Sequence, residues 1–195
     1  MTRLFILSWL FIGATTPIGT AAMATVAFQA AGVMKAAASA TLALERIDPP
    51  VPAPDLYMRD ADNKLVRLSE FRGRYVLLTF WATWCLPCIG EMPSLNRMQA
   101  DLDEKDFKIV PLSLESGDQH KVKGFYREHD IDKLPIYVTE GYSEQEKYEV
   151  HGIPTSFLID PQGKQVWQHV GEIDWDAAET RAFFKEYLKQ PKQPK

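Results

Sequence analysis

The run Tyr75–Trp81 (YVLLTFW) limits the possible folds more than any other feature of the chain. An almost unbroken series of apolar and aromatic side chains is typical of a strand that is buried on both faces of a sheet. The run is followed by residues 85–105, in which Leu95, Met98 and Leu102 recur at helical spacing. The sequence therefore predicts a central buried strand that passes into a helix.

The rest of the chain alternates between short apolar runs and polar segments. A hairpin is expected at residues 56–67, around the turn residues Asp62 and Asn63. Further strands are predicted at 107–114, 136–138, 156–159 and 166–170, and helices at 118–129, 143–150 and 175–189. This order predicts an α/β fold: a mixed central sheet with helices on both faces and an N-terminal β-hairpin extension.

Length and charge exclude some partners. The chain has 195 residues, 46% of them hydrophobic, which suffices for one domain of ordinary size plus additional segments. The formal net charge is -4, and of the 22 basic and 26 acidic residues only Arg3 and Lys35 lie in the first forty positions. The folded part is therefore mildly acidic, and no nucleic-acid partner is expected.

Residues 1–40 are interpreted as an export segment that directs the protein to the periplasm. No residue from Leu4 to Met34 is charged, and Arg3 supplies a positive flank. The triplets at 22–24 (AMA) and 38–40 (ASA) have the small-x-small form of a signal-peptidase site. The uncharged run also exceeds the ~20 residues that span a bilayer, so an uncleaved membrane anchor stays open. The third interpretation is a cytoplasmic, alanine-rich helix.

The boundaries of the folded domain follow from proline and polar segments. Four prolines lie between Glu45 and Asp55, so residues 41–54 are predicted to be a stiff, extended linker rather than a packed element. The folded domain is expected at residues 55–190. A polar tail at 191–195 follows it.

The two cysteines, Cys85 and Cys88, lie three positions apart. A pair this close closes too small a loop to restrain the unfolded chain, which indicates reactivity rather than a structural role. Cys85 is expected at the helix N-terminus and exposed, where unpaired N–H groups and the helix dipole stabilise the nucleophilic thiolate. Cys88, one turn later and shielded, can resolve a mixed disulfide. The pair therefore predicts thiol–disulfide exchange.

Half of a zinc site is the alternative for such a pair. That site needs a second pair of soft ligands, and the sequence has no third cysteine. The four histidines are scattered without ligand spacing, at positions 120, 129, 151 and 169. Neither a metal nor another cofactor is expected.

Two motifs carry a resemblance to a known family. Residues 80–88 (FWATWCLPC) resemble the active-site signature of the thioredoxin superfamily, and the continuation at 89–93 (IGEMP) is similar to its TlpA/ResA branch of thiol–disulfide oxidoreductases. Residues 152–160 (GIPTSFLID) resemble the segment in which that superfamily keeps a cis-proline. The resemblance extends from about Leu56 to Leu188 and implies a thioredoxin-like fold.

The resemblance also implies roles for particular residues. Pro154 is expected to be cis and to face the cysteines, with the backbone of Ile153 pairing with a substrate chain. Glu91, one helical turn after Cys88, is implied as a proton acceptor, and a solvated helix carboxylate is the alternative. Trp84 is expected to shape an exposed apolar surface beside the nucleophile.

The predicted activity is that of a periplasmic protein-disulfide reductase. Its partners would be disulfide-bearing protein substrates and a membrane thiol donor that recharges the dithiol. Family members reduce the disulfide of apocytochrome c in cytochrome c biogenesis, or that of the copper-site cysteines of oxidase-assembly factors, and either client fits. The oxidant direction is less consistent with Leu86-Pro87, because strong oxidases favour a histidine beside the proline.

Two other functions on the same fold are alternatives. A copper-binding assembly module carries three residues between its cysteines and a partner histidine, whereas this chain has two between, and only His151 lies near the second motif. A thiol peroxidase places its cysteine in a Pro-x-x-x-Thr/Ser-x-x-Cys setting, which residues 78–85 lack.

Overall fold

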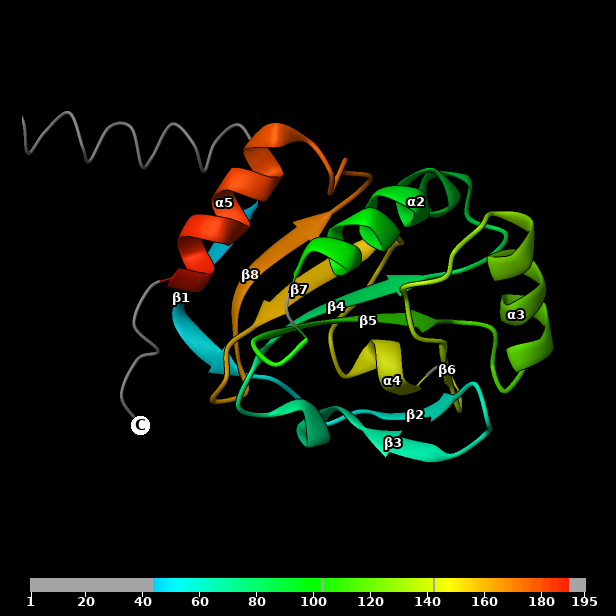
Figure 1. Ribbon diagram of the computed structural model, residues 1–195. Coiled ribbons are helices and arrows are strands. Elements are labelled where there is room, and N and C mark those ends of the chain that lie inside the picture. Colours follow the sequence, from blue (N-terminus) through cyan, green and yellow to red (C-terminus); the bar gives the residue numbers. More distant parts are fainter. Residues whose placement is uncertain (1–43, 103, 142, 190–195) are drawn as a thin grey trace, which may run out of the picture. The chain divides into compact units, whose positions relative to one another are not determined.

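A mixed eight-stranded sheet forms the centre of the computed structural model, which describes residues 44–102, 104–141 and 143–189 (Figure 1). The strands lie in the order β1-β8-β7-β4-β5-β6-β2-β3. Their bounds are Glu45–Pro52 (β1), Tyr57–Asp60 (β2), Leu65–Arg67 (β3), Tyr75–Trp81 (β4), Phe107–Ser113 (β5), Tyr137–Thr139 (β6), Thr155–Ile159 (β7) and Lys164–Val170 (β8). β4 pairs in parallel with β5 and antiparallel with β7, and β2 and β3 form the predicted hairpin.

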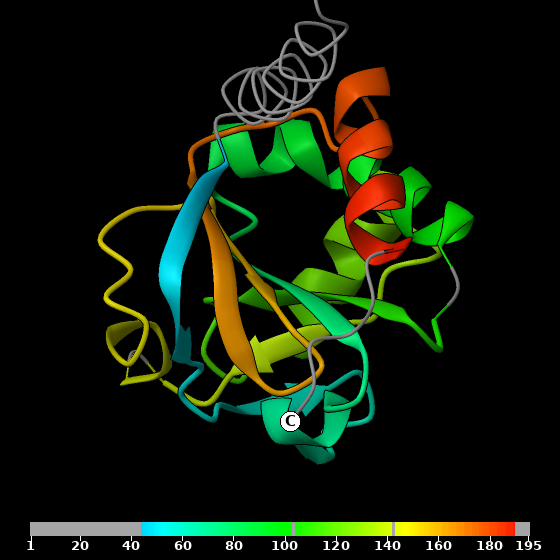
Figure 2. The same cartoon turned by 90° about the vertical axis from the view of Figure 1, so that its left-hand side faces the viewer.

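Helices lie on both sides of this sheet, as the sequence predicted (Figures 1 and 2). Their bounds are Leu68–Phe71 (η1, a 3-10 turn), Leu86–Asp101 (α2), Gln119–Glu128 (α3), Ser143–Glu146 (α4) and Ala178–Lys189 (α5). Side chains of α2, α3 and α5 join one core cluster, and η1 packs into a second cluster on the opposite face. The predicted α/β fold, a mixed central sheet with helices on both faces, is confirmed.

The strand β4 is buried along its whole length because both of its faces are covered. Leu77 and Trp81 point into the cluster beneath the helices α2, α3 and α5. Leu78 and Phe80 alternate with them and point into the cluster on the opposite face. This period-two alternation explains why the sequence of β4 is apolar at nearly every position instead of at every second one.

The strand β1 corrects the prediction of an unpacked linker at residues 41–54. Residues 45–52 are extended, as predicted, but they pair antiparallel with β8 at the edge of the sheet. An edge strand needs ladder hydrogen bonds on one side only, so it tolerates proline. The register with β8 also shifts between Arg46 and Val51, so Pro49 and Pro50 lie outside the regularly paired residues.

The two terminal segments predicted from the sequence lie outside the described residues. These are the export segment at 1–40 and the polar tail at 191–195, together with the first three residues of the expected linker. Across residues 44–102, 104–141 and 143–189, none of the helices combines the length and the apolar character that crossing a bilayer requires.

Replacing Phe80 with alanine is expected to lower the free energy of unfolding by about 3–5 kcal/mol. The Phe80 side chain is fully buried, and its ring centroid lies 5.5 Å from that of Tyr148 and 6.2 Å from that of Phe157. Urea denaturation of the purified variant measures the loss. Leu65→Ala is the control, because Leu65 is 42% exposed and should cost less than about 1 kcal/mol. Equal losses in the two variants would contradict the assignment of this core.

Candidate active site

Three segments meet at one edge of the sheet because of how β4 pairs with its neighbours. The antiparallel register sets Phe80 opposite Thr155, so the segment before β7 lies beside the end of β4. The parallel register sets Trp81 opposite Ser113, so the segment after β5 lies there as well. Residues that are 30 to 70 positions apart in the chain are thereby brought to the loop that carries the cysteines.

Cys85 occupies the N-cap of α2, directly after the loop that leaves β4. Its backbone is extended (φ -92°, ψ 103°), and its Sγ accepts a hydrogen bond from the backbone N–H of Cys88 at 3.3 Å. Pro87 lies in the first helical turn, where a missing N–H costs nothing. The predicted strand-to-helix placement of Cys85 is confirmed. After reduction, the same N–H and the positive end of the helix would stabilise a thiolate.

Cys85 and Cys88 are joined as a disulfide, with their Cα atoms 5.2 Å apart. Cys88 is completely buried, and Cys85 is 7% exposed. The predicted order of exposure is therefore right, but Cys85 is less exposed than predicted. Its sulfur is bonded to a buried partner and lies 3.5 Å from the carbonyl oxygen of Ile153, so the segment before β7 covers one side of it.

The peptide bond between Ile153 and Pro154 is cis, as the resemblance implied. Two hydrogen bonds hold this segment: Thr155 Oγ1 donates to the carbonyl of Gly152 at 2.7 Å, and the N–H of Gly171 donates to the carbonyl of Pro154 at 2.9 Å. The second bond ties the end of β8 to the same loop. The Ile153–Pro154 bond is thus brought next to the disulfide.

Large apolar side chains lie exposed around the cysteines. Trp84 is 64% exposed and Leu86 is 80% exposed, and they precede and follow Cys85 in the chain. Trp81, only three positions before Trp84, is fully buried in the core, as expected for the end of a buried strand. The structure adds Val170 to the exposed apolar residues at the end of β8, which the sequence did not single out. Such a surface suits contact with another protein.

Glu91 is almost completely buried, so it is not the solvated helix carboxylate that was the alternative. Burial raises its pKa to about 8, and the negative charge of Glu172 adds to the rise. The Trp175 indole and the Ile173 backbone lie close to the Glu91 carboxyl and partly counteract the rise in its pKa. Among the described residues, however, neither oxygen of Glu91 forms a hydrogen bond of ordinary geometry. The carboxyl can therefore exchange a proton near neutral pH.

Glu115, to which the sequence assigned no role, is a buried residue near the cysteines. The side chain is buried, and its carboxylate accepts hydrogen bonds from the backbone N–H and the hydroxyl of Thr83, two residues before Cys85. Asp118, three residues after Glu115, caps the helix α3. The position of Glu115 was the one signal in the sequence that could have indicated a role, because Glu115 is an acidic residue directly after the predicted strand at 107–114.

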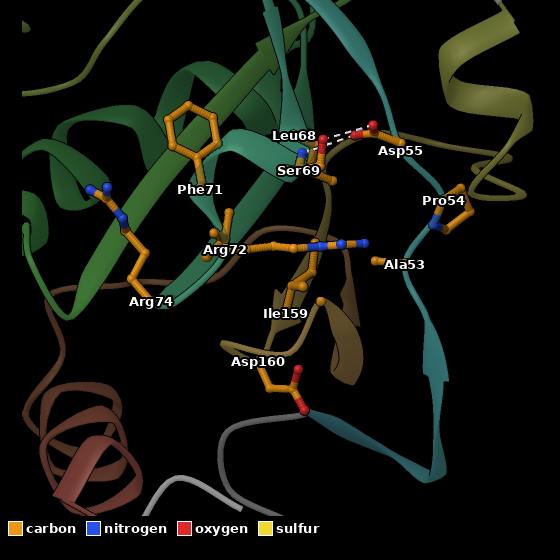
Figure 3. A pocket seen from close by; sticks show the side chains of 12 residues that line it. Ala53, Pro54, Asp55, Leu68, Ser69, Phe71, Arg72, Arg74, Ile159 and Asp160 are labelled. Carbon is orange, nitrogen blue, oxygen red and sulfur yellow. Dashed lines mark hydrogen bonds between the residues drawn. The ribbon is translucent and has the colours of Figure 1, made fainter. Parts of the chain in front are cut away.

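The cleft shown in Figure 3 lies at the opposite end of β4 from the cysteines. It is bordered by Val76 at the start of β4, by Ile159 at the end of β7, and by Asp55, which accepts two hydrogen bonds from Ser69. Its volume of about 20 Å³ is enough for roughly one water. In the parts of the chain that the structure describes, there is also no cluster of three or more metal-ligating side chains.

The chain is similar to known thiol–disulfide oxidoreductases in both sequence and structure. Residues 50–167 match the model of the AhpC/TSA family. The thiol-disulfide oxidoreductase ResA of Bacillus thuringiensis subsp. konkukian is 36% identical over 138 residues, which are 71% of this chain and 75% of that protein. ResA of Bacillus subtilis is 30% identical over 58% of this chain and 63% of its own length. A Chlorobium tepidum structure assigned as the thiol:disulfide interchange protein DsbE superposes with a TM-score of 0.61 at 32% identity, covering 73% of this chain and 96% of that one.

Proposed function

Because this chain belongs to the AhpC/TSA family and is a ResA-like thiol–disulfide oxidoreductase of the thioredoxin superfamily, we propose that it is an exported dithiol that reduces protein disulfides. The observation that carries the proposal is the Cys85–Cys88 disulfide at the N-terminus of α2, 3.5 Å from the carbonyl of Ile153. Such a pair can pass two electrons to a client only if both sulfurs react in turn.

The proposed reaction has two steps. The Cys85 thiolate attacks one sulfur of the client disulfide, which forms a mixed disulfide and releases the other client sulfur as a thiolate. The Cys88 thiolate then attacks Cys85 Sγ, which closes the Cys85–Cys88 bond and releases the second client sulfur. The client gains two electrons and two protons, and the enzyme becomes the disulfide that the structure contains.

Glu91 is proposed to accept the proton of Cys88. A carboxyl whose pKa is about 8 lies close to the ordinary value of a thiol, so the transfer between the two groups costs little free energy. Both side chains are buried on α2, one helical turn apart, where water has little access to act in place of the carboxyl.

Client binding is assigned to the surface around the pair. The backbone of Ile153 would pair with an extended client segment, which tolerates variation in client sequence. The exposed side chain of Trp84 would contact apolar residues that flank the client cysteines. We propose apocytochrome c or the copper-site cysteines of an oxidase-assembly factor as clients, both outside the cytosol.

Export requires a source of electrons at the membrane. With residues 1–40 acting as a signal peptide or an anchor, the spent disulfide would be recharged by a membrane thiol donor. Fractionation of cells that express the tagged full-length chain tests this location, and the mass of the product separates cleavage from anchoring. A product confined to the cytosol would rule out export.

The activity itself is tested with the dithiothreitol-reduced protein and insulin. We expect the interchain disulfides of insulin to be reduced, followed as turbidity. Peroxide consumption without insulin reduction would instead favour a thiol peroxidase. Stoichiometric copper binding without insulin reduction would favour a copper-binding assembly module.

A further inference from the structure

The loop between β4 and α2, residues 82–85, is held by a carboxylate from the segment that follows β5. The backbone N–H of Leu114 donates to the carbonyl of Trp81 at 2.9 Å, which continues the pairing of β4 and β5 past their last paired residues. This pairing places Glu115 beside the loop, where Glu115 is only 7% exposed. Thr83, which it contacts, lies immediately before Trp84 and Cys85.

The Glu115 carboxylate accepts three hydrogen bonds and lies near one lysine. Its Oε1 accepts hydrogen bonds from the Thr83 N–H at 2.8 Å and from the Thr83 hydroxyl at 2.5 Å. Its Oε2 accepts a hydrogen bond from the hydroxyl of Ser113, and Lys121 Nζ lies 3.6 Å from Oε1. Hydrogen bonds to a buried charged acceptor are stronger than neutral ones and hold their partners in a defined geometry.

We propose that Glu115 is a positioning residue for disulfide exchange, because its carboxylate fixes Thr83 and so orients the Trp84 indole toward the client and Cys85 Sγ toward Ile153. The inference rests on the proposed function, since it assigns Glu115 to the same reaction. Glu115 touches neither sulfur in the structure, so it acts through the loop.

The chain contains a matched control for a merely structural role. Glu144 is also a buried carboxylate, 5% exposed, that accepts a backbone N–H bond, from Tyr57 at 3.0 Å. It is likewise paired with a lysine, Lys147 at 2.9 Å. Glu144 lies near β2, and its hydrogen-bond partners, Tyr57 and Lys147, are not in the loop at residues 82–85. Glu144→Gln should therefore cost stability without changing the chemistry of the cysteines.

The first test compares Glu115→Gln, Thr83→Val and Glu144→Gln for the reduction of insulin. Glu115→Gln is expected to lower kcat/KM about tenfold, because it removes the charge from two hydrogen bonds. Thr83→Val removes one of these bonds and should give a smaller loss. The double variant should be less than additive, because both changes act on one contact. Glu144→Gln should stay within about twofold of the unmodified protein.

The second test needs no client, so it remains informative if the proposed function is wrong. The equilibrium of the Cys85–Cys88 pair with glutathione is measured for the same variants. Glu115→Gln should shift it severalfold toward the dithiol, because a freer loop closes the disulfide less readily and a lost negative charge favours the thiolate. Equal effects of Glu115→Gln and Glu144→Gln, or an unchanged equilibrium, would overturn the inference. If Glu115→Gln does not fold, Thr83→Val decides by the same criteria.

Discussion

Replacing Cys85 with serine is expected to abolish insulin reduction. A serine hydroxyl stays protonated at neutral pH and cannot form the mixed disulfide with the client. Cys88 cannot substitute for it, because Cys88 is fully buried in the core beneath α2. The measurement is the turbidity of insulin in the presence of dithiothreitol, compared with the unmodified protein and with dithiothreitol alone. The variant should not exceed dithiothreitol alone.

Cys88→Ser is the paired experiment. This variant keeps the proposed nucleophile but lacks the group that resolves the mixed disulfide, so client adducts should accumulate on Cys85. Mass spectrometry of the adducts under non-reducing conditions locates the linkage. If adducts accumulate in Cys85→Ser instead, then the roles of the two cysteines are reversed.

Glu91→Gln is expected to remove a large part of the pH dependence of stability in the oxidised protein. Glu91 has a folded-state pKa of about 8, against 4.5 as its ordinary value. Between these values the folded protein binds more protons than the unfolded chain, so stability falls as pH rises through the window and levels off above it. The full shift corresponds to a loss on the order of 5 kcal/mol. Glutamine has no proton to lose, so the variant should lack this decline.

Urea denaturation at pH 5, 7 and 9 measures this effect. Near pH 5 the two proteins should be similar in stability, and at pH 9 the variant should be the more stable by several kcal/mol. Glu172→Gln is the control: it removes the like charge that raises the pKa of Glu91, so the decline should persist with its upper end at a lower pH. The same loss of stability with pH in Glu91→Gln would show that another group is responsible.

Glu91→Gln should also slow insulin reduction, by tenfold or more, since general acid–base catalysis contributes about 10²–10⁴ to rates. The opposite signs of the two effects are informative. A variant that is more stable at alkaline pH but slower as a reductase would indicate that the buried carboxyl is kept for chemistry at the expense of stability.

The elements around the site could be predicted from the sequence because local pattern determines them. The strand Tyr75–Trp81 has the predicted bounds, since its residues are buried on both faces and no other element suits so apolar a run. The helix α2 begins within a residue of the predicted position because Cys85 and Pro87 suit an N-cap and a first turn. It ends at Asp101, four residues before the predicted limit.

The features that the sequence did not predict depend on partners far away in the chain. Residues 45–52 were predicted to be a linker because four nearby prolines are locally unsuited to a strand, but the free edge of β8 accepts them. The role of Glu115 depends on Thr83, 32 positions away, which only the pairing of β4 with β5 brings near. The low exposure of Cys85 depends on Ile153, 68 positions away. The spacing of residues along the chain does not indicate any of these contacts.

The reduction potential of the Cys85–Cys88 pair tests the central claim most directly. It is measured by equilibrating the purified protein with glutathione or dithiothreitol buffers and counting free thiols. For a dithiol that reduces client disulfides, we predict a value near that of thioredoxin, ~-270 mV. A value near ~-120 mV, at the oxidant end of the scale, would contradict the assignment of this protein as a reductant.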